Sequence, residues 1–285
     1  MIVYLNGRFL PREEAAISPE DRGFLFADAI YEVVRFYRGR PYRFAEHLDR
    51  MGEGLAAVRI AADISGFSEI AEKLLSENGL GQADALVYLQ VSRGAAPRAH
   101  PFPPPGTPPT VFSFARATDP PPPPGGATAI LLPDERWGRC DIKSVMLLPN
   151  VLAAQKARDA GATDAIFVRD GLAIETTRAN LFLATGGGVR TAPKGPHILP
   201  GVTRAATLAA ARRAGMAVEE RAFTVEEIFA ADELFLASTT MWTYAIVTVE
   251  GRPIGSGKPG PVAARLREML YTEFAGERAG PAVLG

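Results

Sequence analysis

The stretch Arg139-Cys140-Asp141-Ile142-Lys143-Ser144 decides how the rest of this sequence is interpreted, because it sets a lysine directly before an apolar segment. Residues 145–148 are apolar and lead into a helical pattern, so we expect Lys143 to point into the protein interior. A buried ammonium group without a partner has a lowered pKa and becomes a nucleophile or a base. A solvated surface lysine is the more common alternative. The choice between the two depends on residues further along the chain.

The composition is that of an ordinary globular protein. The chain has 285 residues, 47% hydrophobic and 22% charged, which suffices for one large or two medium domains. A formal net charge of −1 argues against nucleic acid or an anionic membrane as a partner recognised through bulk charge. The single cysteine, Cys140, excludes an internal disulfide and suits a reducing compartment. With no apolar run of membrane-spanning length and no signal-like start, we expect a cytoplasmic protein.

A proline-rich run divides the chain. Asp119 is followed by five prolines and two glycines, and such a run cannot join a helix or a central strand. We therefore predict a small N-terminal domain at residues 1–118, an interdomain linker at residues 119–126 and a larger domain at residues 127–285. A proline-rich recognition segment is the competing interpretation.

The spacing of apolar residues predicts an α+β protein with mostly short strands. Residues 2–10 predict a hairpin, since Asn6-Gly7 is a favoured two-residue turn. There is no internal repeat and no regular strand–helix–strand alternation. Further strands are expected at residues 30–37, 85–91, 110–115, 128–132, 164–168, 172–174, 181–184, 234–237 and 245–249. Helices are expected at residues 44–58, 67–75, 152–160, 202–214 and 261–274.

Candidate binding residues in the second half of the chain suit an anionic, nitrogen-containing ligand. Glu175 ends a predicted strand, where a half-buried carboxylate can pair with a cationic ring nitrogen; a solvated loop glutamate is the alternative. Gly201 precedes a predicted helix start at Val202, whose unpaired amides offer a phosphate cradle to which the Thr203 hydroxyl adds. Plain helix capping is the alternative there. The turn at residues 238–240, Ser-Thr-Thr, can close on the same anion.

Candidates in the first half are cationic or aromatic. Arg50 lies on a predicted helix and can neutralise a phosphate, or can be a solvated residue beside Glu46. Arg98 and His100 lie two residues apart in a loop and suit the capture of a carboxylate, although solvated loop residues are the common alternative. The Tyr31 hydroxyl can face a ligand, or the ring can be part of the core.

Other kinds of site find no support in the sequence. His47, His100 and His197 are too widely spaced for metal ligation, so we expect no metal site. No Ser-His-Asp set can be assembled from the spacing. The glycines at residues 186–188 form a turn and not a nucleotide-binding fingerprint.

Taken in order, these blocks resemble the fold-type IV pyridoxal-phosphate enzymes, and within them most closely the bacterial D-amino-acid aminotransferases. The likeness covers nearly the whole chain. It is carried by residues 20–23 (EDRG), 31–34 (YEVV), 46–50 (EHLDR), 93–100, 136–144, 175 with 180–182, 199–204, and 232–235 leading into 238–240. The resemblance implies a two-domain fold, with a small N-terminal α/β domain, a larger C-terminal domain with a barrel-like sheet, and the cofactor at the domain interface.

The resemblance also implies a role for each residue. Lys143 would form the Schiff base with pyridoxal 5′-phosphate and then move the substrate proton. Glu175 would pair with the ring nitrogen, and Leu199 would pack on the ring face. The residues implied to hold the phosphate are Arg50, Val202, Thr203, Ser238 and Thr239. Tyr31 would bind the substrate carboxylate together with Arg98 and His100 of the neighbouring subunit of a homodimer. The expected reaction converts a D-amino acid and 2-oxoglutarate into a 2-oxo acid and D-glutamate.

Two departures and several alternatives accompany the resemblance. Arg178 is large and charged where the relatives carry small residues, and Trp242 follows the hydroxyl-rich turn where the substrate side chain is expected. Both bear on side-chain preference and leave the chemistry untouched. The alternatives with the same fold are aminodeoxychorismate lyase, branched-chain L-aminotransferase and (R)-amine transaminase. A binding protein without catalysis is a further alternative, against which the presence of both Lys143 and Glu175 argues.

Overall fold

The structure is a computed structural model that describes residues 1–120, 122 and 125–277. These residues form two compact units. The first contains residues 1–120 together with 142–147, and the second contains residues 121–141 and 148–285. The proline run of the predicted linker includes residues 121, 123 and 124, which lie outside the described part of the chain, as does the tail beyond residue 277.

The first unit is built on one antiparallel sheet in the order β2-β1-β6-β5-β3-β4. The strands are β1 (Ile2–Leu5), β2 (Arg8–Pro11), β3 (Ala29–Tyr37), β4 (Arg40–Pro41), β5 (Ala85–Ser92) and β6 (Thr110–Ala117). The predicted N-terminal hairpin is confirmed: Asn6 and Gly7 connect β1 and β2 with φ angles of 48° and 87°. Positive φ at both turn positions matches the twist of the two strands.

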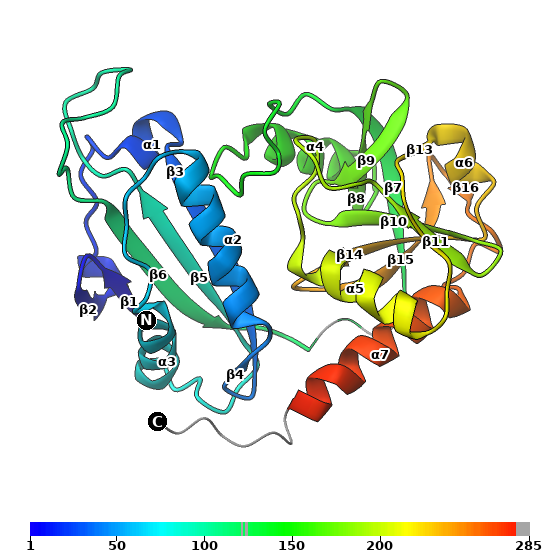
Figure 1. The fold of residues 1–285 in the computed structure, drawn as a ribbon, viewed down its shortest axis with the longest axis horizontal. Coiled ribbons are helices and arrows are strands. Elements are labelled where there is room, and N and C mark those ends of the chain that lie inside the picture. Colours follow the sequence, from blue (N-terminus) through cyan, green and yellow to red (C-terminus); the bar gives the residue numbers. More distant parts are fainter. Residues whose placement is uncertain (121, 123–124, 278–285) are drawn as a thin grey trace. The chain divides into compact units, whose positions relative to one another are not determined.

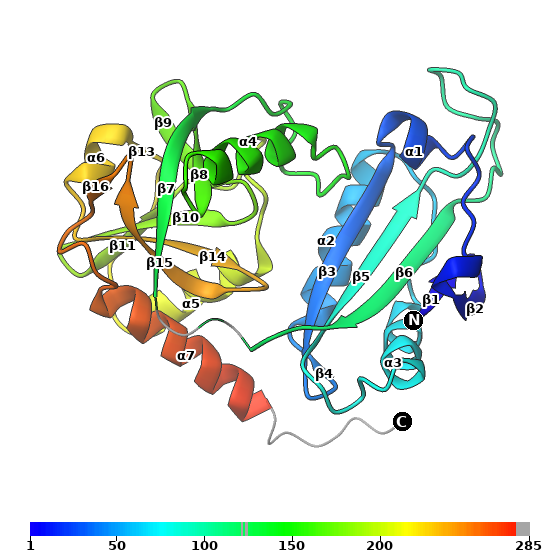
Figure 2. The same ribbon diagram turned by 180° about the vertical axis from the view of Figure 1, so that it is seen from behind.

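Helices cover this sheet. They are α1 (Arg22–Phe26), α2 (Phe44–Ala57) and α3 (Phe67–Glu77). Helix α2 lies along β3, as Figures 1 and 2 show from opposite sides. Gly54 allows this close approach, since a Cβ there would lie 3.2 Å from a methyl carbon of Ile30. The same face of α2 buries His47 and Arg50, which brings two polar side chains against the strand.

Residues 142–147 extend the free edge of β3. The Tyr31 amide donates to the Lys143 carbonyl at 3.0 Å, and the Val145 amide donates to the Ala29 carbonyl at 3.1 Å. Ser144 forms an antiparallel bridge with Ile30. These contacts place residues 142–147 in the first unit. The predicted larger domain, residues 127–285, includes them. The predicted domain bounds otherwise stay a prediction.

The second unit contains a closed barrel of six strands. They are β7 (Gly126–Pro133), β8 (Asp164–Arg169), β9 (Leu172–Thr176), β10 (Asn180–Thr185), β14 (Glu233–Ser238) and β15 (Trp242–Val249). Each pairs with two neighbours in the order β10-β14-β15-β7-β8-β9, and a pairing of Asn180 with Glu175 joins β10 to β9 and closes the ring. The barrel-like sheet that the resemblance implied is thus present.

Alternate residues of the barrel strands form one core, as the two-residue period of a strand requires. Its members include Ala127, Ala129, Leu181, Leu183, Leu234, Leu236 and Ile246. Around the barrel lie β11 (Gly188–Thr191), β12 (Val218–Glu220), β13 (Phe223–Thr224), β16 (Arg252–Pro253), α4 (Leu148–Asp159), α5 (Val202–Arg213), α6 (Val225–Phe229) and α7 (Pro261–Glu277). The α4 helix crosses between the parallel strands β7 and β8 (Figure 1), and α5 lies in the chain between the parallel strands β11 and β12, so strand–helix–strand units occur without a regular alternation.

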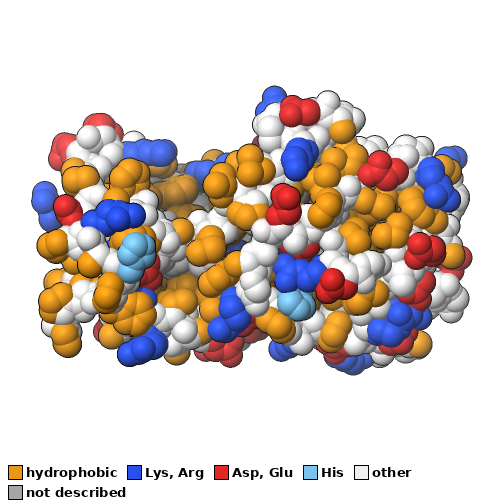
Figure 3. Space-filling view, turned by 90° about the horizontal axis from the view of Figure 1, so that it is seen from above, with side chains coloured by type: hydrophobic (Ala, Val, Ile, Leu, Met, Phe, Trp, Pro, Cys, Tyr) orange, Lys and Arg blue, Asp and Glu red, His pale blue; other side chains and the backbone are white. Residues whose placement is uncertain are grey.

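The exposed surface carries both signs of charge. On the face drawn in Figure 3, basic and acidic side chains lie singly among apolar ones, without a broad patch of either sign. This mixture agrees with the formal net charge of −1. Within the described ranges, no helix has the length and apolar character needed to cross a bilayer.

Candidate active site

Lys143 lies beside Tyr31 in the first unit. Its Nζ is 4.3 Å from the centre of the Tyr31 ring, a distance at which an aromatic face attracts a cation. The Tyr31 ring in turn stacks on Tyr88, with 5.6 Å between the ring centres. Lys143 is half-buried, so the expectation that it points into the interior is only partly met. Its amine is held at the edge of β3 and stays accessible.

A buried carboxylate, Glu32, organises the residues next to Lys143. Glu32 is fully buried and receives two hydrogen bonds from Arg50, Nε to Oε1 at 2.7 Å and a terminal nitrogen to Oε2 at 2.8 Å. His47 Nδ1 lies 2.7 Å from the same Oε2. Burial acts to raise the pKa of Glu32, but Arg50 and His47 outweigh it and lower that pKa from 4.5 to about 2. The carboxylate therefore stays ionised at neutral pH.

This network corrects one interpretation and adds two residues. Arg50 is not a solvated partner of Glu46; that glutamate pairs with Arg43 at 2.8 Å, and Arg50 is buried. Burial lowers the pKa of His47 below 6.5, against the opposing effect of its hydrogen bond with Glu32. Sequence reasoning missed Glu32 and His47 as functional candidates. The available signal was their place in the same motifs as Tyr31 and Arg50.

Arg98 and His100 are exposed in the long connection between β5 and β6. The Arg98 guanidinium lies 5.1 Å from the centre of the Phe26 ring, and the His100 ring lies 5.7 Å from it. No carboxylate in the described part of the chain forms an ion pair with Arg98. The loop thus presents two nitrogen-rich side chains to solvent beside one aromatic ring.

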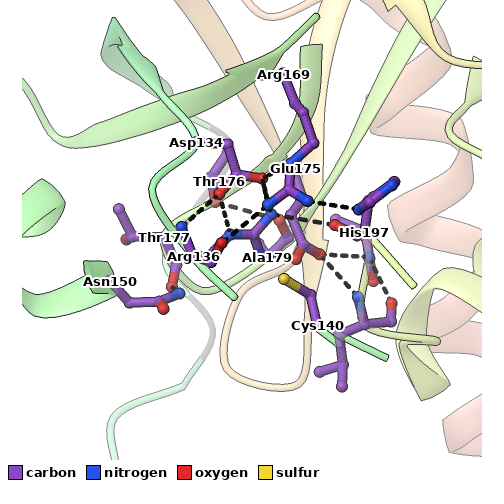
Figure 4. Close-up of polar contacts among 12 residues, drawn as sticks. Asp134, Arg136, Cys140, Asn150, Arg169, Glu175, Thr176, Thr177, Ala179 and His197 are labelled. Carbon is purple, nitrogen blue, oxygen red and sulfur yellow. Dashed lines mark hydrogen bonds and ion pairs between the residues drawn. The ribbon is translucent and has the colours of Figure 1, made fainter. Parts of the chain in front are cut away.

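Glu175 is the central residue of the second unit (Figure 4). It is 5% exposed, and its Oε1 accepts a hydrogen bond from Arg136. Its Oε2 accepts from the Asn180 side chain at 3.1 Å and from the Leu199 amide at 3.2 Å. Burial raises the pKa of Glu175 above 4.5, although Arg136 and the Leu199 amide act in the opposite direction. The predicted half-buried carboxylate at a strand end is therefore fully buried and more basic than usual.

Arg136 binds a second carboxylate besides that of Glu175. It also forms two bonds with Asp134, at 2.8 and 2.9 Å. Arg169 donates to Asp134 at 3.1 Å and lies 2.6 Å from His197 Nδ1 (Figure 4). Two carboxylates therefore share the charge of Arg136, which leaves Glu175 with only part of a positive partner.

The turn that follows Glu175 is held by polar contacts. The Thr176 amide donates to the Ala179 carbonyl at 2.9 Å, and Asn150 donates to the Thr177 carbonyl at 2.8 Å (Figure 4). Buried Asp164 accepts from the Thr177 hydroxyl at 2.6 Å. Arg178 is exposed, with its Nε 3.8 Å from the other Asp164 oxygen. Its size is thus accommodated at the surface.

The start of helix α5 has the form of an anion site. Gly201 is its N-cap residue and provides no side-chain cap, so the first amides of the helix have no partner within it. A Cβ at Gly201 would overlap Asn180 Oδ1, so the close approach of this backbone requires glycine. Val202 and Thr203 are buried there. Leu199, just upstream, is half-buried.

The hydroxyl-rich turn between β14 and β15 is confirmed. Ser238 and Thr239 are half-buried, and the Ser238 hydroxyl lies 3.4 Å from that of Thr240. Trp242 stays a candidate for contact with the substrate side chain. It is 4% exposed and packs on Tyr271 and Phe274 of α7, with ring centres 5.9 and 6.2 Å away. Trp242 is therefore a core residue under the terminal helix.

The donor set of the second unit fits a phosphorylated pyridine. A carboxylate offers about four acceptor positions, and three of those on Glu175 are taken by Arg136, Asn180 and the Leu199 amide. One position remains for a ring N–H. The uncapped start of α5 suits a phosphate. Among the described residues, no three His, Cys, Asp or Glu side chains are grouped to hold a metal ion.

The predicted site residues are divided between the two units. Those in the first are Tyr31, Arg50, Arg98, His100 and Lys143, and those in the second are Glu175, Leu199, Val202, Thr203, Ser238 and Thr239. Within the first unit, Lys143 and Tyr31 are brought together. Within the second, Glu175 and Leu199 are brought together through a hydrogen bond.

Comparison with known proteins gives consistent results. The family described as amino-transferase class IV matches residues 29–248. The D-alanine aminotransferase of Bacillus licheniformis is 38% identical over 281 residues, which cover 98% of this chain and 99% of that protein. The D-alanine aminotransferase of Staphylococcus haemolyticus is 34% identical over 270 residues, covering 93% and 95%.

Solved structures with the same fold include two branched-chain amino acid aminotransferases. The Escherichia coli enzyme has a TM-score of 0.86 at 24% identity, covering 100% of this chain and 97% of that one. The T.th. enzyme, complexed with N-(5′-phosphopyridoxyl)-L-glutamate, has a TM-score of 0.87 at 25% identity, covering 98% and 95%. The chain belongs to the class IV aminotransferases of fold type IV, and it is a pyridoxal-phosphate-dependent aminotransferase.

Proposed function

We propose that this enzyme transfers the amino group of a D-amino acid, with D-alanine as the type substrate, to 2-oxoglutarate, giving a 2-oxo acid and D-glutamate. The observation that carries the proposal is the exposed pair Arg98 and His100, held side by side against Phe26. A planar guanidinium and an imidazole at this spacing can bind the two oxygens of a carboxylate. Full-length similarity to two D-alanine aminotransferases supports the same conclusion.

Each site residue has one role in the proposed reaction. Lys143 Nζ would take the proton from the substrate Cα and pass it to the cofactor carbon that receives the amino group. Tyr31, together with Arg98 and His100 of the neighbouring subunit in a homodimer, binds the substrate carboxylate and thereby selects the face of Cα that meets Lys143. A cytoplasmic location completes the proposal.

Pyridoxal phosphate supplies an electron sink for the carbanion that forms at Cα. Glu175 would accept the ring N–H on its remaining acceptor position, and Leu199 would pack on the ring. The phosphate would be held by Arg50, Val202, Thr203, Ser238 and Thr239. A buried anion such as Glu175 keeps a ring nitrogen protonated because it interacts favourably with the positive charge.

The experiment is a half-reaction on the purified holoenzyme, followed by absorbance of the bound cofactor. D-alanine, L-alanine and L-leucine are added separately, without any 2-oxo acid. We expect D-alanine alone to bleach the absorbance and 2-oxoglutarate to restore it. Bleaching by L-leucine and not by D-alanine would instead favour a branched-chain aminotransferase, the second candidate, which the structural likeness to the T.th. enzyme supports.

The carboxylate-binding role is tested with Arg98→Ala. We expect the KM for D-alanine to rise by up to about 10²-fold, because losing a hydrogen bond between charged groups costs about 1.5–3 kcal/mol of binding. Arg116→Ala is the matched control, since Arg116 is an exposed arginine of the same unit on β6. An Arg98→Ala enzyme with the wild-type KM would rule out the carboxylate-binding role.

A further inference from the structure

We propose that Arg22 is a positioning residue that fixes the loop carrying Arg98 and His100. The inference rests on the proposed function, in which those two side chains bind the substrate carboxylate. Arg22 is the first residue of α1 and is 4% exposed. It acts through the backbone of the loop and does not itself contact the substrate.

The guanidinium of Arg22 binds three successive carbonyls of the loop. One terminal nitrogen donates to the Ala99 carbonyl at 2.6 Å and to the Pro101 carbonyl at 3.3 Å. The other donates to the His100 carbonyl at 3.4 Å. Because the backbone is held from the inside, the side chains of Arg98 and His100 remain directed to the outside, where both are exposed.

The charges around Arg22 explain why these carbonyls are needed. Asp28 accepts from Arg22 Nε at 2.9 Å and from Arg93 at 2.7 and 2.9 Å. Two buried guanidinium groups thus share one carboxylate, which leaves one positive charge in excess. Arg93 directs its remaining donors to the carbonyls of Val58 and Arg59, at 2.7 and 2.8 Å. Arg22 satisfies its own donors with the loop, and a loop that moved away would leave buried N–H groups unpaired.

Aromatic contacts join the same elements. Arg22 lies 4.6 Å from the centre of the Phe26 ring, the ring that Arg98 and His100 also contact. Further along the loop, the Phe102 ring lies 3.7 Å from the Arg93 guanidinium. Both buried arginines therefore reach the loop, one at each side of His100.

The base of the loop is fastened by the residues around Arg22. The Arg22 amide donates to the Gly94 carbonyl at 2.9 Å, and the Ala96 amide donates to the Glu20 carbonyl at 3.2 Å. Gly94 has a φ of 91°, and a Cβ there would overlap the Pro108 carbonyl oxygen, so the chain is tightly packed at this point. In Figure 1, α1 lies next to the start of the long β5–β6 connection. The loop is thus built in advance of substrate, within a single unit.

The test uses the holoenzyme with Arg22→Gln. This variant should fold, because Asp28 and Arg93 then form a balanced pair. Amide hydrogen exchange at Gly94 and Ala96, whose amides are hydrogen-bonded at the base of the loop, should become at least about tenfold faster, since exchange reports local opening. The KM for D-alanine should rise about tenfold with kcat nearly unchanged, as expected when binding geometry alone is lost. Arg22→Lys, which keeps the charge and loses the forked geometry, should give intermediate values.

The matched control is Arg35→Gln. Arg35 is also a buried arginine of the first unit that donates to a loop carbonyl, that of Asp119 at 2.5 Å. It should leave the exchange of Gly94 and Ala96 and the KM for D-alanine unchanged. A second measurement is the double variant Arg22→Gln/Arg98→Ala. Its KM should exceed that of Arg98→Ala by clearly less than the factor that Arg22→Gln gives alone, because Arg22 then acts only through the placement of His100.

The outcomes separate this inference from the function on which it rests. Wild-type exchange at Gly94 and Ala96 in Arg22→Gln would overturn the inference. Faster exchange with an unchanged KM would also overturn it, provided that Arg98→Ala itself raises the KM. Faster exchange combined with a silent Arg98→Ala would support the anchoring by Arg22 and overturn the carboxylate-binding role of Arg98. Multiplying KM effects in the double variant would show that Arg22 acts elsewhere, against the inference.

Discussion

The two units each contain a buried glutamate paired with an arginine, and the two glutamates differ in pKa. Burial acts to raise the pKa of both. Arg50 and His47 more than compensate for burial at Glu32, whose pKa falls to about 2. Arg136 does not compensate for it at Glu175, whose pKa rises. An arginine within hydrogen-bonding distance is therefore not enough to fix the charge of a buried carboxylate.

The difference lies in what else each carboxylate and each arginine contacts. Glu32 receives Arg50 through both oxygens and His47 as a third partner. Glu175 receives Arg136 through one oxygen, while Asp134 binds the same guanidinium twice. Asp134 also raises the pKa of Glu175 directly. A permanently charged Glu32 suits a structural role, and a more basic Glu175 suits a partner that shares a proton.

The largest effect is expected for Lys143→Ala, which tests whether Lys143, and not Glu32 or Glu175, moves the substrate proton. Lys143→Ala should reduce turnover by at least about 10⁴-fold, because it removes the group that moves the substrate proton. Borohydride treatment of the wild-type holoenzyme should label the peptide that contains Lys143. Lys156→Ala, an exposed lysine of α4, is the control and should keep full activity. A label on another lysine would refute the assignment.

The next effect compares the two glutamates directly. Glu175→Gln should reduce kcat by about 10²-fold or more, because a neutral amide no longer stabilises a protonated ring nitrogen. Glu32→Gln should reduce kcat by less than about tenfold, since its effect reaches the reaction only through Arg50 and His47. Steady-state kinetics of both variants measure the contrast. Equal losses of kcat would contradict the different roles assigned to Glu175 and Glu32.

A smaller effect is expected from Asp134→Asn, which should make Glu175 resemble Glu32. Without Asp134, Arg136 would act on Glu175 alone, and the pKa of Glu175 should fall. We expect about a tenfold lower kcat, because Arg136, no longer shared, would offset more of the negative charge with which Glu175 stabilises a protonated ring nitrogen. The pH dependence of kcat, with thermal unfolding as a check on folding, measures the change. An unchanged pH profile would show that Asp134 does not control Glu175.

The smallest effect on turnover is expected for Glu32→Gln, which should instead change the stability of the protein in a pH-dependent way. Its pKa in the folded state, about 2, lies below the usual 4.5, so its ionisation stabilises the fold above pH 4.5. This stabilisation, about 3 kcal/mol, should be lost progressively as the pH falls from 4.5 to about 2. Glu32→Gln should be less stable at pH 7 and show a shallower decline in that range. Urea unfolding at several pH values tests this, and parallel curves for both proteins would contradict it.

The sequence predicted local elements well, because their signals are local. The helix expected at 202–214 spans Val202–Arg213, and the Asn6-Gly7 hairpin has the expected turn. Helix α4 begins at Leu148 and not at residue 152, since the proline at position 149 is tolerated in a first turn, where no amide donor is needed. Two short elements, helix α1 (Arg22–Phe26) and strand β11 (Gly188–Thr191), were not expected at all, because so few residues carry little periodicity.

The network around Glu32 and the closure of the barrel were not predictable from residue patterns. Glu32 and His47 meet only because α2 packs on β3 in one register, which depends on the close approach at Gly54. Barrel closure depends on the pairing of Asn180 with Glu175, which joins β10 to β9 once the other strands of the barrel have paired with their neighbours. Both are set by packing between distant parts of a unit. The family resemblance implied the barrel and did not point to Glu32.

The pairing that closes the barrel also limits where new chain ends or an insertion can be placed. Asn180 donates to Glu175 and to the Leu199 carbonyl at 2.8 Å, so the seam of the barrel and the proposed partner of the ring nitrogen form one structural element. New chain ends placed at residues 177–179 would open that seam. The hairpin at Asp170-Gly171, at the other end of β9, is an exposed turn and offers a site for an insertion that leaves Glu175 in place.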